Sequence, residues 1–200
     1  SDMARGVARM LGIRLMLNFN NPYLATGLGD FWRRWHISLS SWFKDYFYIP
    51  LGGNRHGTIR TYVNLLVTML IGGLWHGAAW TFVAWGGYHG ALLAAERACS
   101  PAWQRVPRPL RPIVTFLLVV AGWVRFRSTP SGMAADWLHR MFVPDTSGLM
   151  ITSPLLPLGI AVAAIVAHTA PNTFALSHRW NGAATAGLAG LFLAVMAVLY

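Results

Sequence analysis

The stretch Leu70-Ile-Gly-Gly-Leu-Trp-His-Gly-Ala-Ala-Trp80 lies inside a run, 61–95, that contains no Asp, Glu, Lys or Arg. This run is far longer than the roughly 20 residues that a helix needs to cross a bilayer. Only 11% of the 200 residues are charged, against about 25% in a soluble domain. Three further apolar stretches have the same character, at about 110–124, 154–170 and 183–200. The sequence therefore predicts an all-α integral membrane protein with several spans.

The charge and cysteine content exclude several classes of function. The formal net charge is +10, from 16 Lys plus Arg against 6 Asp plus Glu. The basic residues lie between apolar runs, where loops and anionic lipid headgroups account for them. We therefore expect membrane lipids, and no nucleic acid, as partners. The single cysteine, Cys99, can form neither an internal disulfide nor a multi-thiolate centre, and we expect no metal site.

Both ends of the sequence interrupt a pattern. Ser1-Asp2-Met3 lacks the basic-then-apolar order of a signal peptide, and Leu199-Tyr200 stands inside an apolar run. We expect residues 1–200 to form a single membrane domain, to be the C-terminal portion of a larger protein, and to be inactive alone.

An interfacial or re-entrant helix is predicted at 31–48. Asn21-Pro22 resembles an N-cap followed by proline, and Gly29-Asp30 offers a second N-cap. At about 100° per residue, the aromatic residues of 31–48 share one face, with His36 at its edge, while the charged residues share the other. Three tryptophans suit a membrane interface better than a simple span. The expected apolar face comprises Trp32, Trp35, Leu39, Trp42, Phe43, Tyr46 and Phe47.

Glycine and proline divide the rest of the chain. Gly72-Gly73 and Gly77 predict a helix break that carries Trp75-His76. The motif-bearing part, 1–98, then has spans near 60–97, and 99–200 holds the C-terminal spans. The other expected elements are an amphipathic segment at 3–19, a glycine-rich turn at 51–57, helices near 60–74 and 78–97, a proline-rich linker at 101–112, a span to Trp123, and loop with a short amphipathic helix at 130–148.

His76 is the leading candidate for chemistry. Ionisable residues within membrane segments are costly and usually face a cavity or pathway. Small residues on either side leave room for a ligand, and burial would keep the imidazole neutral and able to accept a proton. The alternative is a core histidine bonded to a carbonyl. That alternative is favoured for His89, whereas His56, His139 and His178 sit in polar loops and His168 near the end of a span.

The chemistry suggested by His76 is direct group transfer. The sequence has no GxSxG, HExxH, P-loop or dinucleotide-binding motif. Near the motifs the carboxylates are Asp30 and Asp45 alone, which argues against paired-carboxylate catalysis. With histidine as the credible acid/base, the ring would take a proton from an acceptor hydroxyl as that hydroxyl attacks a bound acyl donor.

Ordered motifs support this interpretation. They are Trp32-Arg-Arg-Trp-His-Ile-Ser-Leu-Ser40, Trp42-Phe-Lys-Asp-Tyr46, Tyr48-Ile-Pro-Leu-Gly-Gly-Asn-Arg55 and Gly72-Gly-Leu-Trp-His-Gly77. The sequence closely resembles the membrane-bound O-acyltransferase (MBOAT) family, best its alginate O-acetyltransferase branch, over roughly 1–98 and weakly through Gly122-Trp123.

The resemblance implies a many-helix bundle around a tunnel, with re-entrant helices at its core. It implies His76 as the catalytic histidine and His36 as the second. Acyl groups, with acetyl the expected one, would pass from a thioester (acetyl-CoA or acyl carrier protein) to a hydroxyl of an extracytoplasmic polysaccharide or relay protein. The reaction would take place at the bacterial inner membrane, with periplasmic partner proteins and no bound cofactor. Lys44 stands where the family leads us to expect arginine. The substrate-binding candidates are Trp75, Arg33, Arg34, Lys44 and Asn54.

Two other functions stay open from the residues. A haem-binding electron carrier would use His76 and His89 as axial ligands, although glycines break the chain between them. A transporter would use the broken helix at 72–77 as its substrate site.

Overall fold

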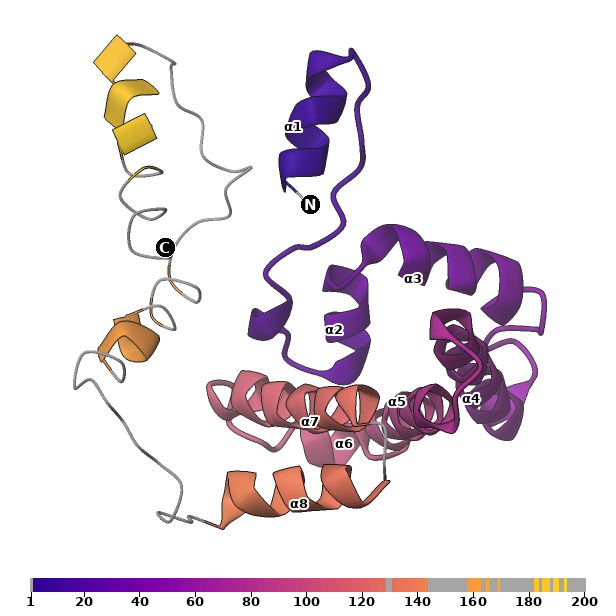
Figure 1. Ribbon diagram of the computed structural model, residues 1–200. Coiled ribbons are helices and arrows are strands. Elements are labelled where there is room, and N and C mark those ends of the chain that lie inside the picture. The colour runs from indigo at the N-terminus through magenta and orange to yellow at the C-terminus, as the bar shows by residue number, and fades with distance from the viewer. Residues whose placement is uncertain are drawn as a thin grey trace. The chain divides into compact units, whose positions relative to one another are not determined.

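The computed structural model describes residues 2–128 and 131–143, together with isolated helical positions between 158 and 193. Each regular element within these residues is helical (Figure 1), which confirms the all-α prediction. Contacts divide the chain into a unit of residues 3–170 and a second of residues 171–200; the single-domain assignment stays a prediction. Most of the spans predicted at 154–170 and 183–200 lies outside the described residues.

The amphipathic segment predicted at 3–19 is helical only in its first part. Helix α1 covers Asp2–Met10, and Gly12 then adopts a left-handed conformation with φ 77°. The amide of Ile13 donates to the carbonyl of Ala8 at 2.8 Å, which is the closing bond of a Schellman motif. Because only glycine enters this conformation without strain, the helix ends there and residues 13–19 have no regular structure.

The prediction of one helix over 31–48 is wrong. A short 3-10 turn, η1 (Pro22–Leu24), confirms the cap at Asn21-Pro22. The helix then begins earlier than expected, with N-cap Gly27, as α2 (Leu28–Arg34). It stops at the extended Trp35 and the left-handed His36, and resumes as α3 (Ile37–Phe43) and a π-helical turn, η2 (Lys44–Tyr48).

The interruption is stabilised by residues that precede it in the sequence. The amide of Ile37 donates to the carbonyl of Asn18 at 2.9 Å. The amide and hydroxyl of Ser38 both donate to the Asn18 side chain, at 2.9 and 2.7 Å. These bonds occupy donors that open a new helix and would otherwise lack partners. The segment around Asn18 therefore makes a break that helical periodicity cannot reveal.

The break predicted at Gly72-Gly73 is also wrong. Helix α4 runs without interruption over Gly57–His76 and ends at Gly77, whose φ is 151°. Helix α5 (Trp80–Ala98) packs along it. A Cβ at Gly73 would overlap the carbonyl oxygen of Phe82, and one at Gly90 would lie 2.9 Å from the Cα of Leu66. These glycines bring two helix backbones together, as small residues do at membrane helix interfaces.

Helix α4 has the length and apolar composition to cross a membrane, and it is the one helix among the described residues to meet both conditions. Helices α5 and α7 (Leu110–Arg127) form where spans were predicted but are less apolar. The proline-rich linker contains a short helix, α6 (Ser100–Trp103). The short amphipathic helix predicted within 130–148 is confirmed as α8 (Ser131–Phe142).

The core lies where α2, α5, α7 and η1 meet. Its buried centre comprises Leu28 and Phe31 of α2 with Val119 of α7. The Tyr88 hydroxyl of α5 donates to the carbonyl of Leu118 on α7 at 2.8 Å. The partly buried side chains around this centre are Trp32, Trp35, Leu92, Leu93, Leu118 and Trp123.

The glycine-rich turn is attached to α4 by one buried amide. Asn64 is 1% exposed, and its Nδ2 donates to the carbonyls of Leu51 at 3.1 Å and Gly53 at 2.9 Å. Replacing Asn64 with alanine leaves both carbonyls unpaired, so we expect the free energy of unfolding to fall by about 1–3 kcal/mol. Thermal melting in detergent measures the loss. The exposed Thr58→Ala on the same helix is the control, and an equal shift in both variants would contradict this role.

Candidate active site

A cavity of about 110 Å³ lies between α3, α4 and α5. Its walls are mostly apolar, and its polar side chains are His76, Lys44, Ser40 and Thr68. The hydroxyls of Thr68 and Ser40 already donate to the carbonyls of Asn64 at 2.7 Å and of Trp35 at 3.0 Å. Of these four side chains, His76 and the exposed Lys44 therefore remain to contact a ligand. The remaining lining residues are Trp32, Leu39, Phe43, Met69, Gly72, Trp85 and Leu93.

His76 is the last residue of α4 and opens onto this cavity. Its imidazole is packed edge-on by aromatic rings, with centroid distances of 4.9 Å to Trp75, 5.3 Å to Trp85 and 5.0 Å to Phe126. The residue is nevertheless exposed, so the neighbouring aromatic rings cover only part of its surface. Of the two glycines before His76, Gly73 faces α5, whereas Gly72 lines the cavity beside Phe43. The position of His76 at a helix end leaves one side of its ring open.

His36 stands at the break between α2 and α3. Its backbone is left-handed, with φ 46° and ψ 54°, a conformation that non-glycine residues seldom adopt and that often marks a functional position. Its Nδ1 is buried and has no hydrogen-bond partner among the described residues. His36 lies within electrostatic range of His76, although it is not among the residues that line the cavity. The structure thus places the two histidines predicted from the motifs in the same region.

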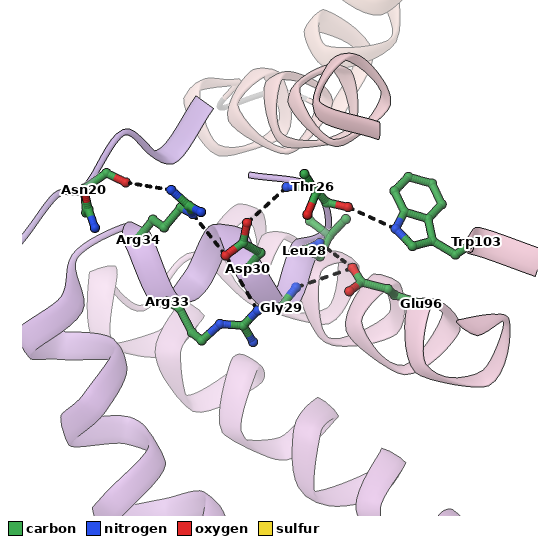
Figure 2. Close-up of polar contacts among 9 residues, drawn as sticks. All are labelled: Asn20, Thr26, Leu28, Gly29, Asp30, Arg33, Arg34, Glu96 and Trp103. Carbon is green, nitrogen blue, oxygen red and sulfur yellow. Dashed lines mark hydrogen bonds and ion pairs between the residues drawn. The ribbon is translucent and has the colours of Figure 1, made fainter. Parts of the chain in front are cut away.

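Arg33 and Arg34 are not among the residues lining the cavity and pair with Asp30 (Figure 2). Arg34 Nε donates to Asp30 Oδ1 at 3.0 Å, and an Arg33 nitrogen lies 3.6 Å from the same oxygen. Burial alone would raise the pKa of Asp30, but the hydrogen bonds from Arg34 and the Thr26 amide, with both guanidinium charges, hold that pKa below its usual value. Both arginines therefore form structural ion pairs with Asp30.

The other predicted binding residues are placed differently. Lys44 lines the cavity and lies 3.6 Å from the exposed carboxylate of Asp45. Trp75 covers one side of His76 and is 55% exposed. Asn54 is exposed in the glycine-rich turn and is not among the residues lining the cavity.

Several site residues were missed by sequence reasoning. Trp85 and Trp32 line the cavity, and each has a buried indole N–H without a partner among the described residues. His89 is buried in the core as predicted, at 1% exposed, but the expected hydrogen bond is absent: both ring nitrogens lack partners in the described part of the chain. His89 instead packs on Trp85 at 4.9 Å and Trp32 at 5.3 Å.

This geometry weakens the two rival functions. The indole of Trp85 packs against both His76 and His89, at 5.3 and 4.9 Å, which leaves no room for a porphyrin between the two rings. The transport hypothesis started from a helix broken at 72–77, whereas α4 is continuous up to His76 and ends only at Gly77.

The chain belongs to the MBOAT, membrane-bound O-acyltransferase family, whose sequence profile matches residues 3–131. A probable alginate O-acetylase AlgI of Azotobacter vinelandii is 58% identical over 143 residues, covering 71% of this chain and 29% of that protein. A protein of the same name from Pseudomonas aeruginosa is 54% identical over 183 residues, covering 90% and 35%. The peptidoglycan O-acetyltransferase of Helicobacter pylori is 48% identical over 131 residues, covering 64% and 25%.

These matches confirm the resemblance found in the motifs, both to the family and to its alginate branch. They also make this a chain of a membrane-bound protein. The chain spans about a third of the length of the curated alginate O-acetylases that it matches.

Proposed function

We propose that the complete protein is an O-acyltransferase that moves an acetyl group from a thioester to a hydroxyl of an extracytoplasmic polysaccharide or relay protein. The observation that carries this proposal is a solvent-accessible imidazole, His76, on a cavity shared with Lys44, with His36 within electrostatic range. The names of the relatives, which include O-acetylases of alginate and peptidoglycan, support acyl transfer to a polysaccharide. A cavity of about 110 Å³ is small beside the roughly 300–1,000 Å³ of typical ligand pockets, which favours a short acyl group.

His76 acts as the general base in this proposal. The acceptor oxygen attacks the thioester carbonyl carbon while a ring nitrogen of His76 removes the hydroxyl proton. The carbon–sulfur bond then breaks, and the thiolate leaves and takes up the proton that His76 holds. The products are an O-acyl ester and a free thiol, and His76 returns to its neutral form.

The remaining residues bind and orient the substrates. Lys44 places an ammonium group at the cavity, where it attracts the phosphates of acetyl-CoA or of an acyl carrier protein. As a point charge it lacks the bidentate geometry of arginine. His36 orients the acceptor or stabilises the developing charge. Arg33 and Arg34 are weaker candidates than Lys44 for binding the donor, because both pair with Asp30. Asn54 is also a weaker candidate, because it is exposed in the glycine-rich turn.

The setting proposed for this reaction is the bacterial inner membrane, with a tunnel that lets donor and acceptor arrive from opposite sides. Periplasmic proteins would carry the acetyl group onward. The test is transfer of labelled acetyl from acetyl-CoA by the complete protein in detergent or proteoliposomes, with an O-acetylatable polysaccharide as acceptor. Ester formed at the expense of thioester supports the proposal. Thioester that stays intact with every acceptor, while the protein moves solute across the vesicle, would favour transport.

Replacing His36 with asparagine separates its chemistry from its backbone. Asparagine tolerates the left-handed conformation, so we expect the melting temperature to stay close to that of the wild type. Asparagine cannot carry the charge of an imidazole, and we expect turnover to fall by about tenfold or more. Transfer and melting are measured on the same preparation. Unchanged turnover per folded molecule, with a lower melting temperature, would make His36 a structural residue.

A further inference from the structure

Glu96, at the C-terminal end of α5, caps a helix that is distant in the sequence. Its carboxylate accepts hydrogen bonds from the amides of Leu28 and of Gly29, the latter at 3.4 Å, in the first turn of α2 (Figure 2). The first amides of a helix have no partner within the helix, and a negative charge at that end is favourable. Gly27, the N-cap residue, has no side chain to do this. A carboxylate 68 residues away from Leu28 does it instead.

Gly27 leaves the space that this carboxylate fills. A Cβ at Gly27 would lie 2.7 Å from Glu96 Oε1, which is closer than real Cβ contacts. The Ser, Thr, Asp or Asn that usually caps a helix would therefore displace Glu96. Gly27 at the cap and the distant Glu96 together form the contact that joins α2 to α5.

The rest of the loop before α2 is held by side-chain bonds as well. Trp103 Nε1 donates to the carbonyl of Thr26 at 3.0 Å, and the Thr26 amide donates to Asp30 Oδ2 at 3.1 Å (Figure 2). Asp30 in turn binds Arg34. Helix α2 is thereby fixed at its start, and His36 follows two residues after its end.

Helix α5 also supports the other histidine. Near its start, Phe82 and Trp85 pack on His76, at centroid distances of 6.1 and 5.3 Å. At its far end Glu96 fixes α2, which leads directly to His36. One rigid helix of 19 residues therefore connects the supports of both imidazoles.

We propose that Glu96 is a positioning residue for the transfer reaction: by capping α2 it sets where His36 stands relative to His76. The inference rests on the proposed function. Because misplacing a reacting group by about 1 Å can cost roughly a hundredfold in rate, release of α2 should be visible in turnover without any loss of donor binding.

The test uses Glu96→Ala in the complete protein, in the wild-type and the His36→Asn backgrounds. We expect turnover to fall by about tenfold to a hundredfold with the KM for acetyl-CoA unchanged. In the His36→Asn background we expect no further loss, since the residue being positioned has gone. Glu96→Gln, which keeps an acceptor oxygen, should restore most of the activity. Asp136→Asn is the matched control, because this carboxylate is exposed and pairs within α8, with Arg140 at 3.1 Å.

A second readout does not depend on activity. Carbethoxylation of His36 by diethyl pyrocarbonate, quantified on peptides, should become several-fold faster in Glu96→Ala, while the exposed His56 is labelled at the wild-type rate. Glu96→Leu, which fills the same space, replaces the alanine variant where that one does not fold. Equal losses of turnover in both backgrounds, or unchanged labelling of His36, would overturn the inference. A wild-type protein without transfer activity would refute the proposed function alone. The labelling rate of His36 would still test whether Glu96 holds α2 in place.

Discussion

Replacing His76 with alanine is expected to lower turnover of the complete protein by about 10²–10⁴-fold, the usual contribution of a general base. This range corresponds to roughly 3–5 kcal/mol in the activation barrier. Because the ring stands at the end of α4 and is exposed on one side, its removal loses the ring contacts with Phe82 and Trp85 but keeps the close glycine contacts between α4 and α5. We therefore expect normal expression and normal binding of acetyl-CoA.

The matched control is His56→Ala, which removes an exposed imidazole just before the start of α4. Its turnover should equal that of the wild type. Acetyl-CoA binding, measured by calorimetry or by competition, separates loss of chemistry from loss of donor. An alanine variant that binds no donor would assign His76 to binding and not to proton transfer.

Replacing Gly86 with alanine is expected to have the largest effect on folding. A Cβ at Gly86 would overlap the carbonyl oxygen of Met69 and lie 3.1 Å from the Cα of Leu70. Backbone atoms cannot move aside as a side chain does, so α4 and α5 must separate. We expect a loss of about 3 kcal/mol or more, at the upper end of overpacking effects, and consequently poor yield of folded protein.

The neighbouring residue supplies the control for this experiment. A Cβ at Gly87 would meet only the Cδ2 of Leu70, at 3.6 Å, which is an ordinary contact. Alanine also favours helix over glycine by about 1 kcal/mol. Gly87→Ala should therefore melt at or above the wild-type temperature. Equal destabilisation of Gly86→Ala and Gly87→Ala would contradict the close approach of the two helices.

The helical pairing around Gly72-Gly73 shows how far sequence reasoning reaches. The apolar run predicted the two helices α4 and α5, and Gly77 predicted where α4 ends. Glycine, however, has two uses in membrane helices, since it can break a helix or let two helices touch. Which of the two uses applies depends on the residue that faces each glycine. Gly73 faces Phe82 and Gly86 faces Met69, and helical periodicity does not indicate such contacts between separate helices.

Some residues of the candidate site could be predicted from the sequence, and others are defined only by tertiary contacts. His76 and His36 belong to local motifs, and the family resemblance implied a role for each. The left-handed backbone of His36 depends on Asn18, and the capping of α2 depends on Glu96. Neither partner belongs to a motif, and each is defined only by tertiary contacts. Arg33 and Arg34 do belong to a motif, and from the sequence they were candidates for binding the donor. In the structure, however, both pair with Asp30 on the same helix.

The most direct test of the account is the turnover of His76→Gln, measured with labelled acetyl-CoA on protein whose folding and donor binding have been verified. Glutamine is polar and of similar length, so it can replace a hydrogen bond at the end of α4, but it cannot accept a proton at neutral pH. If His76 is the base, the glutamine variant should be almost as inactive as alanine, at about 1% of wild-type turnover or less. Turnover above about a tenth of the wild-type value, a smaller loss than a general base ordinarily causes, would mean that the ring supplies only a hydrogen bond.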